Sequence, residues 1–355
     1  MIKIQTKPTK VIDEAEDEGI TSNYRITSYG QDFDVEGLVK RIKREDIFVP
    51  KFQREFVWNK TQASRFIESL LLGLPVPGVF LSKERESQKL LVIDGQQRLF
   101  SLFHFYEGIF ADSEREFILT GLRTQYNGKK YKTLFQEDKR RLDDSVIHAT
   151  IIRQDEPEDG DSSIYSVFER LNTGGTQLQP QEIRGALYHG LFNDLLTSLN
   201  SNLSWRELYG PISPRKKDEE LILRFFALYF EVENYKRPMK EFLNSYMDRN
   251  RNFVLQSKDQ LISVFSETVE FIDRYLGSRA FKPETALNAA VYDSLMVGVA
   301  LRLKKEFIVD KDNFIKRYKE LLDNEEYLAS TKTGTSSDKN VRTRIQLGID
   351  AFENI

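Results

Sequence analysis

The chain has 355 residues, enough for two domains or one large one, and its 40% hydrophobic and 30% charged residues are typical of a globular protein. Its formal net charge of −3 excludes a polycation, so any contact with DNA must come from a local basic patch. The absence of cysteine excludes disulfides and thiolate metal sites, and the three histidines (His104, His148 and His189) lack metal-ligand spacing, so we expect neither zinc nor haem.

The N-terminal segment shows no signal-peptide pattern. It contains an acidic run from Asp13 to Glu18 and few apolar residues, which predicts a mobile lead-in over residues 1–21. The longest apolar runs in the chain are too short to cross a bilayer. These features favour a cytoplasmic protein without membrane contact.

The next segments alternate between helix and extended patterns. Apolar side chains at helical spacing predict a helix over residues 35–47. Residues 48–58 are aromatic and basic and are broken by Pro50, so we expect an extended loop or short strand there. A capping box formed by Asn59 and Gln62 then predicts a second helix.

Two short apolar runs, residues 79–81 and 90–93, predict a pair of strands joined as a hairpin. The second run leads into an Asp-Gly turn and then a largely apolar helix over residues 99–106, which we expect to end at Gly108. A further strand is predicted over residues 146–152.

From about residue 191 the pattern changes to long amphipathic helices with almost no strand signal. The predicted fold class is therefore α+β, with an N-terminal α/β domain over residues 22–200 and an all-helical domain over residues 201–355.

The junction between the second strand and its helix concentrates polar groups that suit phosphate. It reads Asp94-Gly95-Gln96-Gln97-Arg98. A strand-to-helix turn directs backbone N–H groups and a guanidinium toward one point, where phosphate is a suitable ligand. The alternative is an ordinary capped turn in which the arginine makes a structural salt bridge.

Two other loop-to-helix junctions carry similar groups. The candidate binding residues there are Arg54 and Trp58 in the first, and Asn172, Thr173, Gly174, Gly175, Thr176, Gln181, Glu182 and Arg184 in the second. Arginine forks and glycine turns bind phosphate, an aromatic ring can stack on a base, and Asp94 or Glu182 could hold Mg²⁺. The set suits a nucleoside triphosphate, although no P-loop motif is present. Each junction also has a purely structural interpretation, as a helix staple, a turn or a solvated helix face.

In their order along the chain, these motifs resemble the N-terminal domain of GmrSD-type modification-dependent restriction proteins. The resemblance rests on Phe52-Gln53-Arg54, Val57-Trp58, residues 94–98, residues 168–176 and residues 181–184. It covers at least residues 48–190 and extends to residues 288–295 and 336–345.

The resemblance implies a ParB/sulfiredoxin-like fold for the N-terminal domain. It also implies nucleotide binding and hydrolysis, with Asp94, Gln97 and Arg98 as catalytic residues at the phosphates. It further implies a role in bacterial defence against phage DNA with modified bases or backbone, coupled to an HNH-type nuclease in the same chain or in a partner.

The helical half departs from nuclease-containing members of that family. No histidine follows His189, so we do not expect an HNH site there. We expect His104 to pack within an apolar helix, and neither His148 nor His189 has an evident partner. Glu137-Asp138-Lys139 fits part of another nuclease motif but is typical of a solvated helix face. We therefore expect a stand-alone member that does not cleave DNA by itself.

The leading hypothesis is a nucleotide-binding or hydrolysing sensor or regulator subunit that uses a nucleoside triphosphate and Mg²⁺, contacts DNA, and works with a separate nuclease subunit. The helical half would contact DNA or that subunit through Lys216-Lys217 or Arg342 and Arg344. The alternatives are a non-catalytic ParB-like DNA-binding module and a nuclease with an unrecognised site. The sequence leaves open whether the chain forms a homo-oligomer.

Overall fold

The computed structural model describes residues 9–13, 25–49, 56–84, 87–111, 115–156, 162–171, 178–305, 310–353 and 355. The chain divides into two compact units, an α/β unit over residues 23–178 and a helical unit formed by residues 1–22 and 179–355. The predicted order, an α/β region followed by a helical region, is confirmed. The division falls after Leu178, whereas the hydrophobic pattern placed it at about residue 200.

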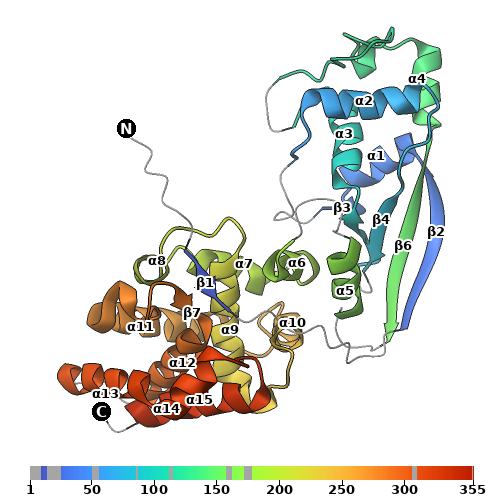
Figure 1. Ribbon diagram of the computed structural model, residues 1–355. Coiled ribbons are helices and arrows are strands. Elements are labelled where there is room, and N and C mark those ends of the chain that lie inside the picture. Colours follow the sequence, from blue (N-terminus) through green and yellow to red (C-terminus); the bar gives the residue numbers. More distant parts are fainter. Residues whose placement is uncertain are drawn as a thin grey trace, which may run out of the picture. The chain divides into compact units, whose positions relative to one another are not determined.

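The α/β unit is built on a five-stranded mixed sheet with the strand order β2-β6-β4-β5-β3. The strands are β2 (Arg25–Asp34), β3 (Ile47–Phe48), β4 (Val79–Lys83), β5 (Leu90–Asp94) and β6 (Val146–Glu156). The antiparallel pairing of β4 with β5 confirms the predicted hairpin. Strands β2 and β6 form a long antiparallel pair, and β6 runs parallel to β4 (Figure 1).

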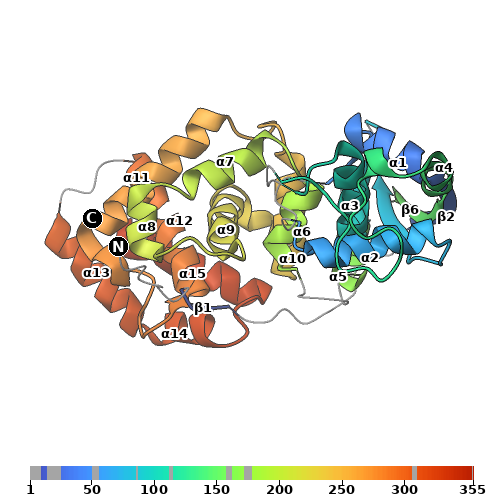
Figure 2. The ribbon, with the colours of Figure 1, turned by 90° about the horizontal axis from the view of Figure 1, so that it is seen from above.

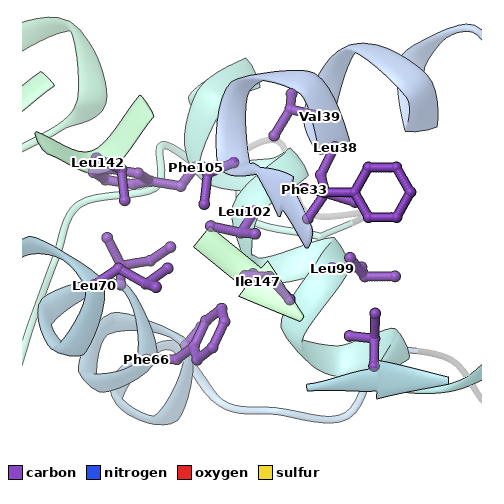
Figure 3. Packing of buried hydrophobic residues seen from close by; sticks show 14 of the residues in the cluster. Phe33, Leu38, Val39, Phe66, Leu70, Leu99, Leu102, Phe105, Leu142 and Ile147 are labelled. Atoms are coloured by element: carbon purple, nitrogen blue, oxygen red, sulfur yellow. The ribbon is translucent and has the colours of Figure 1, made fainter. Parts of the chain in front are cut away.

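Five α-helices accompany the sheet in the described part of this unit: α1 (Val35–Lys43), α2 (Lys60–Leu71), α3 (Gln96–Glu107), α4 (Gln136–Asp143) and α5 (Ser162–Leu171). The apolar stripes of α1 to α4 pack on one face of the sheet, where Leu38, Leu70, Leu102 and Ile147 are buried (Figure 3). The predicted capping box at the start of α2 is present. This packing fixes the ends of β5 and α2, where the candidate site lies.

The helical unit contains α6 (Pro180–Leu187), α7 (Leu191–Leu199), α8 (Leu203–Tyr209), α9 (Lys217–Glu231), α10 (Met239–Arg249), α11 (Lys258–Leu276), α12 (Ala289–Lys305), α13 (Lys311–Asp323), α14 (Glu325–Lys332) and α15 (Asp338–Phe352). Helices α9 and α12 are buried over most of their length, and other helices of the unit surround them (Figure 2). No helix in the described ranges is long and apolar enough to span a membrane.

The N-terminal segment is held in the helical unit where the structure describes it. Strand β1 (Val11–Ile12) pairs in parallel with β7 (Leu287–Asn288), and Asp13 makes an ion pair of 3.0 Å with Arg224. The expectation of a mobile lead-in over residues 1–21 is therefore wrong for residues 9–13. Asp13, which belongs to the acidic run of the sequence, is the ion-pair partner of the buried Arg224.

Arg224 belongs to a buried ion cluster in the core of the helical unit. The carboxylate of Asp293 accepts hydrogen bonds from Arg224 Nε at 2.7 Å and from Arg344 Nη2 at 2.6 Å. Asp293 is fully buried, and each of its oxygens is bound by a guanidinium group. Arg344 comes from the tail segment singled out in the sequence, and its role in the structure is to complete this core.

Candidate functional site

The turn between β5 and α3 requires glycine at its centre. Gly95 has φ +101°, in the region that favours glycine, and serves as the N-cap of α3 without a capping side chain. A Cβ atom at this position would lie 2.5 Å from Cγ1 of Val79, the first residue of β4. The Val79 side chain of β4 therefore occupies the space that a side chain at position 95 would need.

Asp94, at the end of β5, and Arg98, in the first turn of α3, are four residues apart and form an ion pair. Arg98 Nη2 donates to Asp94 Oδ2 at 2.6 Å, and the side chains of Arg98 and Asp94 are 17% and 47% exposed, respectively. Arg98 Nε is buried and has no hydrogen-bond partner among the described residues. The structural salt bridge that the sequence left open is present, and it also holds the guanidinium at the N-terminal turn of α3.

Gln97 connects this turn to the loop that precedes α2. Its Oε1 accepts hydrogen bonds from the backbone N–H of Val57 at 2.9 Å and of Trp58 at 3.1 Å. The Trp58 ring packs edge-on against Phe66 of α2, with ring centroids 5.9 Å apart. The structure thus brings two of the predicted motifs together, and the side-chain carbonyl of Gln97 is used in joining them.

Two sets of candidate residues lie outside the described residues: Arg54 and residues 172–176. The helix that leads to the second set is described. α5 packs against β5 and β6, and its Phe168 is fully buried.

The remaining candidates, Gln181, Glu182 and Arg184, belong to α6 in the helical unit. Glu182 accepts a hydrogen bond from the backbone N–H of Gln179 and makes an ion pair of 2.8 Å with Arg215. The interpretation of this stretch as a solvated helix face is wrong, because Gln181 and Arg184 are each 1% exposed.

Arg184 is held in a buried polar network. It donates to Asn244 Oδ1 at 2.8 Å and to Glu220 Oε2 at 2.8 Å, and Lys217 binds the other oxygen of Glu220. Burial alone would raise the pKa of Glu220, but Arg184 and Lys217 outweigh that effect and lower the pKa below its usual value. These polar groups bind one another within the helical unit.

The basic residues expected to contact DNA in the helical half are also engaged. Lys216 and Lys217 pair with Glu219 and Glu220, each one turn further along α9. Arg342 Nη2 donates to the carbonyl of Glu233. The burial of Arg344 described above contradicts the expectation that it contacts DNA, whereas Lys216, Lys217 and Arg342 have partners within the helical unit and keep 19%, 31% and 48% of their side chains exposed.

A pair that the sequence did not reveal joins β2 and β6. His148 Nδ1 lies 2.7 Å from Asp32 Oδ1, and the imidazole covers Gly30. The expectation that His148 has no partner is therefore wrong. The two residues are 116 positions apart, so only the strand register brings them together. By contrast, His104 packs among aromatic rings, including Phe56 at 5.3 Å, as expected.

The segment Glu137-Asp138-Lys139 lies in the first turn of α4, and the Glu137 side chain is 87% exposed and faces Arg141 at 3.6 Å. This agrees with its interpretation as a solvated helix face. Among the described residues, no group of three or more histidine, aspartate or glutamate side chains could hold a metal ion.

Comparison with known proteins agrees with the motif order. Residues 35–189 match the family model described as GmrSD restriction endonuclease, N-terminal domain. No curated protein was found to match the chain. The matched region contains α6, the β5–α3 turn and the loop that precedes α2. Over residues 35–189, just under half of its length, the chain is similar to the GmrSD restriction endonuclease N-terminal domain family.

Proposed function

We propose that the chain binds a nucleoside triphosphate at the β5–α3 turn and acts as a nucleotide-dependent sensor or regulator in a DNA restriction system. The match of residues 35–189 to the GmrSD N-terminal domain family supports the restriction setting. DNA cleavage would then fall to a separate nuclease subunit, because no histidine follows His189 to supply the general base of an HNH site.

One observation carries the nucleotide-binding proposal. A largely buried guanidinium, that of Arg98, is fixed by Asp94 at the N-terminus of a helix whose cap is a glycine. The helix N-terminus carries partial positive charge, and an arginine held in one orientation loses little entropy when it binds phosphate oxygens. The buried and unpartnered Nε of Arg98 is a further donor for such a ligand.

The proposal assigns different roles in ligand binding to the residues around the turn. Arg98 would bind phosphate oxygens, and Gln97 would position the loop that carries Trp58. Arg54 and residues 172–176 stay candidate binding residues on the strength of their sequence. Gln181, Glu182 and Arg184 are not assigned ligand contacts, because their polar groups are engaged within the helical unit.

A Mg²⁺ ion that accompanies a nucleotide takes one or two carboxylates and obtains its other ligands from phosphates and water. Asp94 fits that requirement, because its carboxylate is about half exposed and Arg98 binds its Oδ2. The ion would neutralise phosphate charge when bound. Asp94 therefore has two roles in the proposal, orienting Arg98 and contributing a metal ligand.

The test is nucleotide turnover by the wild-type chain and by Arg98→Ala, with and without DNA carrying modified bases. We expect turnover by the wild type and a loss of at least about tenfold in the variant, because a charge-assisted bond to phosphate contributes on the order of 1.5 kcal/mol or more. Arg98→Lys keeps the charge but not the fork, and should recover only part of the activity.

Two outcomes would contradict the proposal in different ways. Absence of nucleotide binding and turnover by the wild type would overturn the function and favour a non-catalytic DNA-binding module. Equal turnover by the wild type and Arg98→Ala would overturn the site while leaving the function in place.

A further inference from the structure

The stretch from residue 115 into α4 is strongly basic, although the chain as a whole is slightly acidic. Residues 115–141 contain eight lysines and arginines but only three acidic residues. The segment runs along α2, to which it is tied by a hydrogen bond from the backbone N–H of Thr120 to Ser64 Oγ at 3.0 Å (Figure 1). Its charge therefore accumulates on one part of the α/β unit.

Hydrogen bonds, an ion pair and a cation–π contact hold the lysines of this region, which we together call the lysine face. Lys60 Nζ and Lys130 Nζ both bind Glu116, the former through its backbone carbonyl at 2.9 Å and the latter through its carboxylate at 2.6 Å. Lys139 Nζ donates to the carbonyl of Lys132 at 3.1 Å. The lysine face consists of Lys60, Lys129, Lys130, Lys132 and Lys139, together with the ring of Phe135.

Among the described residues of this stretch, acidic groups do not balance this charge. Glu116 is the acid at the centre of the face, and Lys130, followed by Lys132 and Lys60, lowers its pKa below the usual value. Asp143, further along α4, accepts hydrogen bonds from the hydroxyls of Tyr106 and Tyr131. The lysine face thus keeps an excess of positive charge close to solvent.

Phe135 gives the face an aromatic group in an unusual position. Its side chain is 72% exposed at the N-cap of α4, and Lys129 Nζ lies 5.3 Å from the ring centroid. A large apolar side chain this exposed contributes little to the core. An exposed ring bordered by a lysine can serve as a platform on which a nucleic-acid base stacks.

We propose that the lysine face binds DNA, with the lysines contacting phosphates along a strand and the ring of Phe135 stacking on an unpaired base. Lysine-rich grooves with exposed aromatic rings bind single strands in this way, with little dependence on sequence. The inference deepens the proposed function, on which it rests for the restriction setting, and assigns DNA contact to the α/β unit instead of the basic residues of the helical unit.

The test uses the full chain and measures binding to a single-stranded oligonucleotide and to the matching duplex over a range of salt concentrations. We expect tighter binding of the single strand. Lys129→Ala/Lys130→Ala/Lys132→Ala should weaken it and reduce the slope of log affinity against log salt by roughly 0.7 for each phosphate that the variant no longer neutralises. Phe135→Ala should weaken single-strand binding about fivefold or more and change duplex binding little.

A matched control removes the same kind of charge elsewhere in the unit. Lys40 and Lys43 are exposed lysines of α1, outside the lysine face, so Lys40→Ala/Lys43→Ala should change affinity little. Thermal unfolding of each variant establishes that the fold is intact.

Equal losses in the lysine-face and control variants would overturn the proposal, as would failure of the wild type to bind either DNA. Tight duplex binding that Phe135→Ala does not weaken would overturn the stacking role. The proposed function is tested separately, because lysine-face variants should retain nucleotide binding whereas Arg98→Ala should lose it and retain DNA binding.

Discussion

At the scale of single residues, the Asp94–Arg98 pair contributes more to orientation than to stability. Exposed or half-exposed ion pairs one helical turn apart contribute on the order of 0.5 kcal/mol or less to folding. The 2.6 Å contact nevertheless leaves the guanidinium few orientations at the start of α3. A binding group held in this way would lose little freedom when a phosphate arrives, so we expect Arg98 to affect ligand affinity more than it affects stability.

Gly95 allows a prediction with a control in the same helix. Gly95→Ala places a methyl group in a left-handed backbone conformation and within 2.5 Å of Val79 Cγ1. Gly108, at the other end of α3, has φ +81° but open space around it, so Gly108→Ala carries the backbone cost alone, about 1–2 kcal/mol. In urea unfolding, Gly95→Ala should lose clearly more stability than Gly108→Ala. Equal losses would show that the approach of β4 does not matter.

The sequence predicted those residues of the site whose geometry is local. The turn at residues 94–98 and the capping box of α2 depend on neighbours within one helical turn, and both are present. The Asp32–His148 pair depends on the β2–β6 register. That register could not be predicted from the sequence, because strand β2 lacks the apolar alternation of a half-buried strand. Most of β2 is exposed, and the strand contains Gly30 and Asp32.

At the scale of elements, α6 and α9 are joined by buried charges rather than by apolar packing alone. Arg184 and Lys217 bind the two oxygens of Glu220, which is 8% exposed. The amphipathic pattern predicted that α9 exists, but it could not show that its acidic first turn is buried. A buried carboxylate is tolerated here because each oxygen has a cationic partner.

The lowered pKa of Glu220 makes stability depend on pH. Since the folded pKa lies below the ordinary value of 4.5, the contribution of Glu220 is fully present above about pH 4.5 and is lost as the pH falls through the folded pKa. Glu220→Gln should cost on the order of 3 kcal/mol at pH 7. The difference in unfolding free energy from the wild type should shrink below pH 4.5.

Glu233→Gln, at a 90% exposed side chain, provides the control and should show almost no difference at any pH. A Glu220→Gln gap that stays constant from pH 7 to pH 3 would contradict this assignment.

At the scale of the whole molecule, the chain forms a helical unit from two separate stretches. Residues 9–13 add β1 and Asp13 to a unit otherwise formed by residues 179–355, and the α/β unit lies between them in sequence. The division into an α/β part and a helical part could be predicted from the change in hydrophobic period. The contribution of the N-terminal stretch could not, because a two-residue strand and one ion pair leave no periodic signal.

Asp13→Asn tests this arrangement. It leaves Arg224 and Arg344 with Asp293 as the one acid of the cluster, so we expect a loss of about 1.5–3 kcal/mol from the helical unit. Hydrogen exchange should become faster in α9 and α12 and remain unchanged in the sheet of the α/β unit. Glu284→Gln, at an exposed acid of the same unit, should affect neither. Unchanged exchange in α9 and α12 of Asp13→Asn would show that the N-terminal stretch is not part of the core.

Equilibrium binding of nucleoside triphosphates to the full chain, with Mg²⁺ present, tests the central claim most directly. We expect saturable binding by the wild type, an affinity lower by about tenfold or more in Arg98→Ala, and unchanged affinity in Arg65→Ala, which removes an exposed arginine from α2. All three proteins should melt at nearly the same temperature. Binding that survives Arg98→Ala undiminished, or a wild type that binds no nucleotide, would contradict the claim.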